Sequence, residues 1–150
     1  MADFTTRPAV VTDAGDIARV FSSSFRLLSF LPILHTPEED RWFIETVVLK
    51  ECTVTVAERG GGIVAFLALE GRDVRMLYVQ PDCIGAGAGS LLLEGAKRSA
   101  EALELWCFQA NQRARRFYER HGFKAVRFTD GSDNEEKAPD VRYRWECDRG

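Results

Sequence analysis

The sequence has 150 residues, 45% of them hydrophobic and 29% charged, and its 20 basic and 23 acidic side chains leave a formal net charge of −3. This length and composition are typical of one globular domain with a buried core. The acidic balance argues against nucleic acid as a partner, because nucleic-acid-binding domains are usually basic. The longest uncharged apolar run, residues 63–69, is far shorter than the ~20 residues that span a bilayer. We therefore expect a single domain over residues 1–150, with no nucleic acid and no membrane among its partners.

The cysteines and histidines do not have the spacing of a metal site. Four cysteines lie far apart in the chain without a Cys-x-x-Cys pair: Cys52, Cys83, Cys107 and Cys147. Neither His35 nor His121 can complete a site at those separations, so we expect no metal. Irregularly spaced cysteines are typical of reduced thiols, and Asp3 and Arg7 have no apolar stretch behind them that would form a secretory signal. Both observations favour a cytoplasmic protein.

The N-terminal half predicts a strand, two helices and a three-stranded meander. A strand over residues 4–7 precedes a helix that Thr12 or Asp13 can cap, and Thr36-Pro37-Glu38-Glu39 has the capping-box pattern that begins a second helix. Strands are predicted over residues 52–58, 63–69 and 74–79, joined by short glycine turns. Such short turns require antiparallel neighbours, because a parallel return needs a long crossover.

The C-terminal half alternates helices with strands. We predict helices over residues 90–102 and 114–121, and strands over residues 103–108, 124–128 and 141–145. Gly122 suits the position that ends the second of these helices. A strand–helix–strand order implies a parallel pair in an otherwise antiparallel sheet. The expected fold class is therefore α/β (α+β), a mixed, mostly antiparallel sheet flanked by helices.

A glycine-rich loop, residues 79–90, joins the third meander strand to the next helix. Its small residues let a ligand approach the backbone, whose N–H groups point outward at the positive end of a helix, as pyrophosphate binding requires. A P-loop is excluded because no Gly-Lys-Ser/Thr triplet occurs. A dinucleotide fingerprint fits poorly, because position 90 is serine and three antiparallel strands come first. A flexible strand-to-helix connection is the alternative.

A basic segment follows downstream. Residues 111–127 contain six basic side chains and one acidic side chain, Glu119. In an acidic protein, this segment suits a multiply charged anion. The alternative is a solvated helix face, as for most charge runs.

The glycine loop followed by Asn111-x-x-Ala114-x-x-Phe117-Tyr118-x-x-x-Gly122-Phe123 resembles the GCN5-related N-acetyltransferase (GNAT) superfamily. Arg7-Pro8-Ala9 followed by Asp13-Ala14 is also similar to the start of such domains. The resemblance implies an enzyme that transfers an acetyl group from acetyl-CoA to a primary amine by direct attack in a ternary complex. It also implies that the strand over residues 74–79 splays from its parallel neighbour over residues 103–108, which frees backbone groups for the pantetheine arm.

The resemblance assigns roles to particular residues. Tyr118 matches the tyrosine that can protonate the departing thiolate. Ile84 stands where the family pattern has Gln or Arg, so we expect weakened CoA binding, with nearby arginines compensating. The cofactor-binding residues are Leu77, Tyr78 and Val79 for the pantetheine arm, Gly85, Ala86, Gly87, Ala88, Gly89 and Ser90 for the pyrophosphate, and Asn111 and Ala114 along the arm.

Acetyl transfer also needs a base and an acceptor site. Glu70 is the first candidate for the general base and Asp73 the second, and the alternative is that both are solvated turn residues. The family places acceptor contacts on the first two helices and their connection, here residues 25–41 with Phe30 and His35. The loop over residues 129–140 has five acidic side chains and one lysine. This charge suits a small cationic amine, or else marks a solvated connection.

Several functions stay open. The same loops would serve a non-catalytic acyl-CoA sensor, and the acceptor could instead be a peptide N-terminus or a protein lysine. A nucleotide-dependent oxidoreductase is a distant alternative, because the dinucleotide fingerprint fails. A homodimer also stays open.

Overall fold

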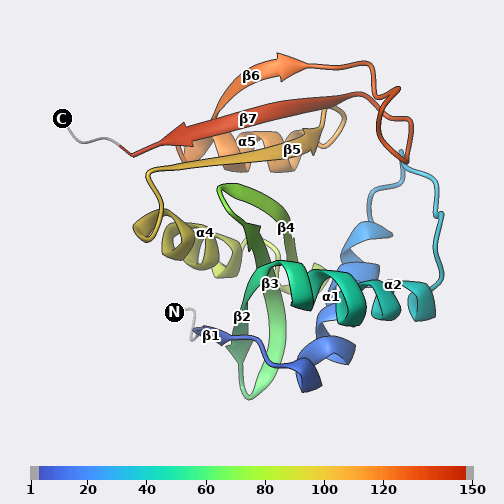
Figure 1. The fold of residues 1–150 in the computed structure, drawn as a ribbon, viewed down its shortest axis with the longest axis vertical. Coiled ribbons are helices and arrows are strands. Elements are labelled where there is room, and N and C mark those ends of the chain that lie inside the picture. Colours follow the sequence, from blue (N-terminus) through green and yellow to red (C-terminus); the bar gives the residue numbers. More distant parts are fainter. Residues whose placement is uncertain (1–3, 148–150) are drawn as a thin grey trace.

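The computed structural model describes residues 4–147, whose strands form one sheet in the order β1-β2-β3-β4-β5-β7-β6 (Figure 1). Every neighbouring pair is antiparallel except β4 and β5. The predicted mixed, mostly antiparallel sheet is confirmed. The strands are β1 Thr5–Pro8, β2 Thr53–Arg59, β3 Gly62–Glu70, β4 Asp73–Val79, β5 Ala102–Phe108, β6 Lys124–Phe128 and β7 Asp140–Glu146.

Helices cover both faces of the sheet. They are α1 Ala14–Phe25, α2 Pro37–Phe43, α3 Leu49–Glu51, α4 Ala88–Arg98 and α5 Gln112–Arg120, and a π-helical turn, Ile44–Val48, joins α2 to α3. One core cluster packs α4 and Tyr118 of α5 against the sheet. A second cluster packs α1 and the π-helical turn against the opposite face, around Phe66 of β3. Within residues 4–147, no helix has the length and apolarity needed to cross a bilayer.

Local signals begin the helices largely as expected. The Thr36 hydroxyl accepts a hydrogen bond from the Glu39 N–H at 3.1 Å, and the Glu39 carboxylate accepts one from the Thr36 N–H at 2.9 Å. The predicted capping box is therefore confirmed. The helix predicted after Asp13 is also confirmed, but the Asp13 side chain does not cap it. Its carboxylate instead accepts a hydrogen bond from the Val10 N–H at 2.8 Å.

Strands β4 and β5 touch at one end and then diverge. Their only paired residues are Asp73 and Glu104, whereas all seven residues of β5 pair with β7. Arg142 of β7 ties the closed end together, because its guanidinium hydrogen-bonds to Asp73 and, at 3.1 Å, to Glu104. The splay that the resemblance implies is present, and it opens toward the Val79 end of β4 (Figure 1).

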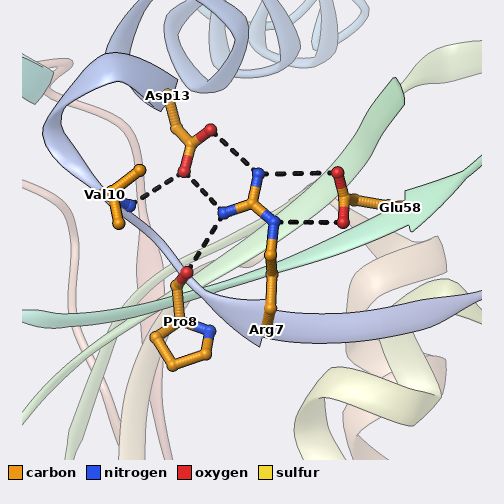
Figure 2. Close-up of polar contacts among 5 residues, drawn as sticks. All are labelled: Arg7, Pro8, Val10, Asp13 and Glu58. Atoms are coloured by element: carbon orange, nitrogen blue, oxygen red, sulfur yellow. Dashed lines mark hydrogen bonds and ion pairs between the residues drawn. The ribbon is translucent and has the colours of Figure 1, made fainter. Parts of the chain in front are cut away.

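Arg7 joins the edge strand to its neighbour and to the start of α1 (Figure 2). Its guanidinium donates to both carboxylate oxygens of Asp13, at 2.8 and 2.9 Å. It also donates to Glu58 of β2 at 3.0 Å, and to the Pro8 carbonyl at 3.1 Å. The hydrogen bonds from Arg7 hold the pKa of Asp13 below its ordinary value. The ionised form of Asp13 therefore stabilises the folded state.

We expect Asp13→Asn to lower the free energy of unfolding at neutral pH by about 1–3 kcal/mol, because it removes charged hydrogen bonds from a buried site. Since the pKa of Asp13 is depressed in the folded state, its contribution is lost as the pH falls through that pKa. The difference from the wild type should therefore shrink in acid, as measured by urea unfolding at several pH values. Asp16→Asn is the control, because Asp16 is exposed and its ion pair with Arg19 is long, at 3.7 Å. An equal loss in both variants would contradict this role.

Candidate active site

A cavity of about 730 Å³ opens where β4 and β5 diverge. This size falls within the range of small-molecule sites. Its walls come from the end of α1, from β4, from the glycine loop and from α5. Of the residues predicted to hold a cofactor or to act in catalysis, it brings together Leu77, Tyr78, Val79, Gly85, Gly87, Ala88, Gly89, Ser90, Asn111, Ala114 and Tyr118. Ala86 lies in the same loop but outside the cavity wall.

The glycine loop presents its backbone to this cavity. Gly85 and Gly87 have φ angles of +85° and +103°, which residues with a side chain rarely adopt. The first hydrogen bond of α4 runs from the Leu91 N–H to the Gly87 carbonyl at 3.0 Å. The N–H groups of residues 88–90 precede this bond, so they form the positive end of the helix, which favours an anion. A β-carbon on Gly89 would lie 3.4 Å from Val79 and 3.5 Å from Phe117, so α4 packs closely against both.

Tyr118 places a phenol in the cavity wall. Its ring packs against Phe117, Phe123 and Tyr143, with ring centroids 5.3, 5.6 and 6.2 Å away. Burial raises its pKa well above the ordinary value, so the phenol stays protonated at any physiological pH. None of the described residues hydrogen-bonds to its hydroxyl, which leaves the proton available to a bound molecule.

The structure does not bring Glu70 to this cavity. Glu70 ends β3 and forms an exposed ion pair with Arg75 at 2.5 Å, and Asp73 is bound to Arg142. Both carboxylates lie at the closed end of β4, because the β3–β4 turn sits where β4 and β5 meet. The cavity opens at the other end of β4. The alternative of a solvated turn residue therefore describes Glu70, whereas Asp73 is half-buried and bound to Arg142.

Ser24, which no sequence motif includes, belongs to the N-terminal wall of this cavity, and so does Phe30, which is expected among the acceptor contacts. The Ser24 hydroxyl donates to the Val79 carbonyl at 2.6 Å, so it fixes one of the backbone groups that the splay exposes. The signal for Ser24 in the sequence is its position on the apolar face of the helix, at helical spacing from Ile17 and Val20. Arg113 and Arg120 of the basic segment also line the cavity, whereas Arg115 turns away to the Tyr143 hydroxyl at 3.1 Å.

A second cavity, of about 600 Å³, lies on the α1 and α2 side of the sheet. Apolar and charged side chains share its lining, and exposed charged residues such as His35 and Glu135 form part of its rim. The apolar residues are Phe21, Phe25, Ile33, Leu34, Trp42 and Phe43, and the charged or titratable ones are Arg26, His35, Glu39, Asp40, Glu135 and Glu136. His35 and the acidic loop are predicted to lie near the acceptor, and His35, Glu135 and Glu136 line this cavity. Phe30, predicted with His35, lines the first cavity instead.

The rim of the second cavity joins two segments that lie 100 residues apart. His35 Nε2 lies 2.6 Å from Glu135 Oε1, which links the α1–α2 connection to the β6–β7 loop, drawn in red at the right of Figure 1. The hydrogen bond with Glu135 raises the pKa of His35. The loop itself is held by internal hydrogen bonds, such as those between Asn134 and Ala138 at 2.7 and 3.2 Å. The β6–β7 loop is thus ordered, and it holds Glu135 at the rim of the second cavity.

Tyr78 lies between the two cavities. It lines the first cavity, and its ring packs edge-on against Phe21 of the second, with centroids 5.0 Å apart. Burial raises the pKa of Tyr78, and the negative charges of Glu136 and Asp40 raise it further. Four carboxylates line the second cavity against Arg26 and His35, and this excess of negative charge favours a cation.

The sequence model of the family described as "Acetyltransferase (GNAT) domain" matches residues 50–125. An uncharacterized N-acetyltransferase of Archaeoglobus fulgidus is 30% identical over 128 residues, which cover 75% of this chain and 87% of the relative. This chain belongs to the GNAT acetyltransferase family. The resemblance seen in the motifs is confirmed.

Solved structures of GNAT proteins have the same fold as this chain. Apo YjaB from Escherichia coli has a TM-score of 0.75 and 24% identity, covering 96% of this chain and 98% of YjaB. The PaiA N-acetyltransferase from Thermoplasma acidophilum, in complex with coenzyme A, has a TM-score of 0.74 and 16% identity, covering 97% and 100%. In sequence, YjaB is a peptidyl-lysine N-acetyltransferase 35% identical over 63 residues, or 42% of this chain and 43% of YjaB.

Proposed function

We propose that this protein is an N-acetyltransferase that transfers the acetyl group of acetyl-CoA to the primary amine of a small cationic acceptor. The observation that carries the proposal is the first cavity, where the exposed edge of β4, the glycine loop and Tyr118 line one space. The chain's membership of the GNAT family supports the reaction class. The coenzyme A complex of PaiA, which shares the fold, supports the donor.

Acetyl-CoA would lie along the first cavity with its phosphates at the glycine loop. Backbone N–H groups of residues 85–90 and the positive end of α4 would hold the pyrophosphate. The pantetheine arm would run beside Leu77, Tyr78 and Val79, whose β5-facing side has no strand partner. Asn111 and Ala114 would flank the arm at the start of α5. Because the Asn111 side-chain oxygen already accepts the Ala114 N–H at 3.2 Å, its free amide nitrogen would face the cofactor.

In the reaction, a neutral amine attacks the thioester carbonyl, a C–N bond forms and the C–S bond breaks. The departing sulfur would take its proton from Tyr118, whose raised pKa keeps that proton in place until it is needed. The amine also loses a proton, and Asp40 and Glu136, which line the second cavity, are better placed to accept it than Glu70, which lies outside both cavities. We therefore do not assign the base to Glu70.

The second cavity would bind the acceptor. Its aromatic and aliphatic side chains suit an apolar body, and its carboxylates suit an ammonium group, which aromatic faces also attract. An amine with both features fits better than a polyamine, which has no large apolar part. The peptidyl-lysine activity of YjaB keeps a protein lysine, also a cation on an apolar stem, as the second candidate acceptor.

Gly87→Leu should weaken coenzyme A binding about tenfold, since a β-carbon disfavours the left-handed backbone at Gly87 by about 1–2 kcal/mol. A β-carbon at this position would meet nothing within 4 Å, so the fold should survive. Gly71→Leu is the matched control, because Gly71 has a φ of +61° and equal space but lies in the β3–β4 turn. Calorimetric titration of both folded variants measures the effect. Unchanged affinity in Gly87→Leu would place the phosphates elsewhere.

Tyr118→Phe should lower kcat about 10²-fold and leave the KM for acetyl-CoA nearly unchanged, because only the proton donor is lost. The control is Tyr143→Phe. The Tyr143 hydroxyl is buried outside the cavity and donates to Glu119 at 2.6 Å, so its loss should lower stability rather than kcat. Steady-state assays of thiol release measure both. Equal kcat for wild type and Tyr118→Phe would make Tyr118 a packing residue.

The double variant Glu135→Gln/Glu136→Gln should raise the KM for 2-phenylethylamine several-fold. A second double variant, Asp130→Asn/Asp133→Asn, removes two charges from the same loop outside the second cavity. If the second cavity binds the ammonium group directly, only the first pair should raise the KM. If the loop attracts the cation from a distance, both pairs should raise the KM equally, and salt should weaken the effect. Equal KM values in all three proteins would reject this acceptor site.

Binding of acetyl-CoA without turnover of any amine or lysine peptide would instead indicate a non-catalytic sensor.

A further inference from the structure

Three side chains form a hydrogen-bonded chain at the phosphate end of the first cavity. Ser90 Oγ lies 3.0 Å from His121 Nε2, and His121 Nδ1 lies 2.8 Å from Glu94 Oε2. Ser90 and Glu94 are one turn apart on α4, and His121 follows the last residue of α5. Ser90 lines the cavity, whereas the His121 side chain is only 17% exposed. The histidine is thus held behind the serine.

The charged groups around this histidine come from α4 and α5. Lys97 forms an ion pair with Glu94 at 3.1 Å and donates to the His121 carbonyl at 2.5 Å. On α5, Arg120 precedes the histidine and lines the cavity, and the Phe117 ring lies 4.7 Å from the imidazole. Glu94 is the anionic group in direct contact with the ring, so it can stabilise a positive charge there.

The protonation state of His121 decides what Ser90 can donate. The Glu94 carboxylate only accepts hydrogen bonds, so Nδ1 carries a hydrogen in both states. In the neutral ring Nε2 is an acceptor, and the Ser90 hydroxyl must give its hydrogen to it. In the charged ring Nε2 donates to Ser90 Oγ, and the hydroxyl hydrogen becomes free to point into the cavity.

We propose that His121 is a positioning residue that takes up a proton when the cofactor's pyrophosphate binds, and so makes Ser90 a hydrogen-bond donor to it. This inference rests on the proposed function, which puts the pyrophosphate beside Ser90. Phosphate oxygens only accept, so they select the state with a charged His121. The aliphatic side chain of Ile84 in the same wall has no donor to offer. Binding and protonation are therefore linked, and affinity falls as the pH rises.

Ser90, His121 and Glu94 are hydrogen-bonded in the order of a Ser–His–acid catalytic triad. The site nevertheless does not favour acyl transfer to Ser90. The thioester would lie at residues 77–79 of β4, whereas Ser90 lies beyond the glycine loop in the first turn of α4. An anion-binding role fits its place at the positive end of this helix.

The test uses 3′-dephospho-CoA, because the 3′-phosphate of coenzyme A itself titrates near pH 6 and would obscure the linkage. Calorimetric titrations from pH 5.5 to 8 should show about tenfold weaker binding by the wild type at the alkaline end. The titrations are then repeated in buffers of different ionisation enthalpy. The observed binding enthalpy should depend on the buffer between acidic and neutral pH, which indicates that the complex takes up a proton on binding. Ser90→Ala should bind with the alkaline affinity at every pH. His121→Phe should also bind without pH dependence, but no more weakly than the wild type at the alkaline end, because Phe offers Ser90 no acceptor and leaves its hydroxyl free to donate.

His35→Gln is the matched control, since the chain has only two histidines and His35 lies in the second cavity. It should keep the pH dependence of the wild type. If His121→Phe does not fold, NMR titration of the His121 ring in the wild type replaces it, and its transition should move to higher pH when 3′-dephospho-CoA binds. A flat wild-type profile, an unmoved ring transition or a pH dependence kept without Ser90 would overturn the inference and leave the proposed function standing. No binding at any pH would overturn the proposed function itself.

Discussion

The site depends on one clamp between strands that barely pair. Asp73 of β4 and Glu104 of β5 share Arg142 of β7, and this contact holds one end of the two strands together. β5 pairs with β7 along its whole length but with β4 at one residue only, and β4 and β5 part toward the other end. Backbone that would otherwise complete a ladder is left facing a cavity. A sheet that paired regularly here would have no room for a cofactor, so the clamp and the opening belong to one arrangement.

The two cavities differ in charge in the way that the two proposed substrates do. The first has the positive end of α4 together with Arg113 and Arg120, which suits an anionic donor. The second has carboxylates from α2 and the β6–β7 loop, which suit a cationic acceptor. Tyr78 lies between them, so the strand that would hold the donor also borders the acceptor. Opposite potentials on the two sides of one strand would keep the substrates apart until they meet at the thioester.

Order in the β6–β7 loop is a property that composition could not reveal. Its acidic sequence is equally typical of a solvated connection. Gly131, with a φ of +83°, lets the loop fold back so closely that a β-carbon there would lie 2.2 Å from the Ala138 backbone. Gln109 of the β5–α5 connection also donates to the carbonyls of Thr129 and Asp140, each at 2.9 Å. These contacts hold Glu135 where it can reach His35.

The sequence alone determined the features that depend on near neighbours in the chain. The capping box at Thr36 and the glycine turns follow from residues a few positions apart. The order of these locally predicted elements requires one parallel pair, and the glycine and Phe117-Tyr118 motifs indicated the family. Tertiary structure alone decided which side chains meet. It moved Glu70 away from the cavity, and it brought His35 to Glu135 and His121 to Ser90. Such contacts join residues 31 to 100 positions apart, and they form only when packing of the helices on the splayed sheet sets the distance between segments.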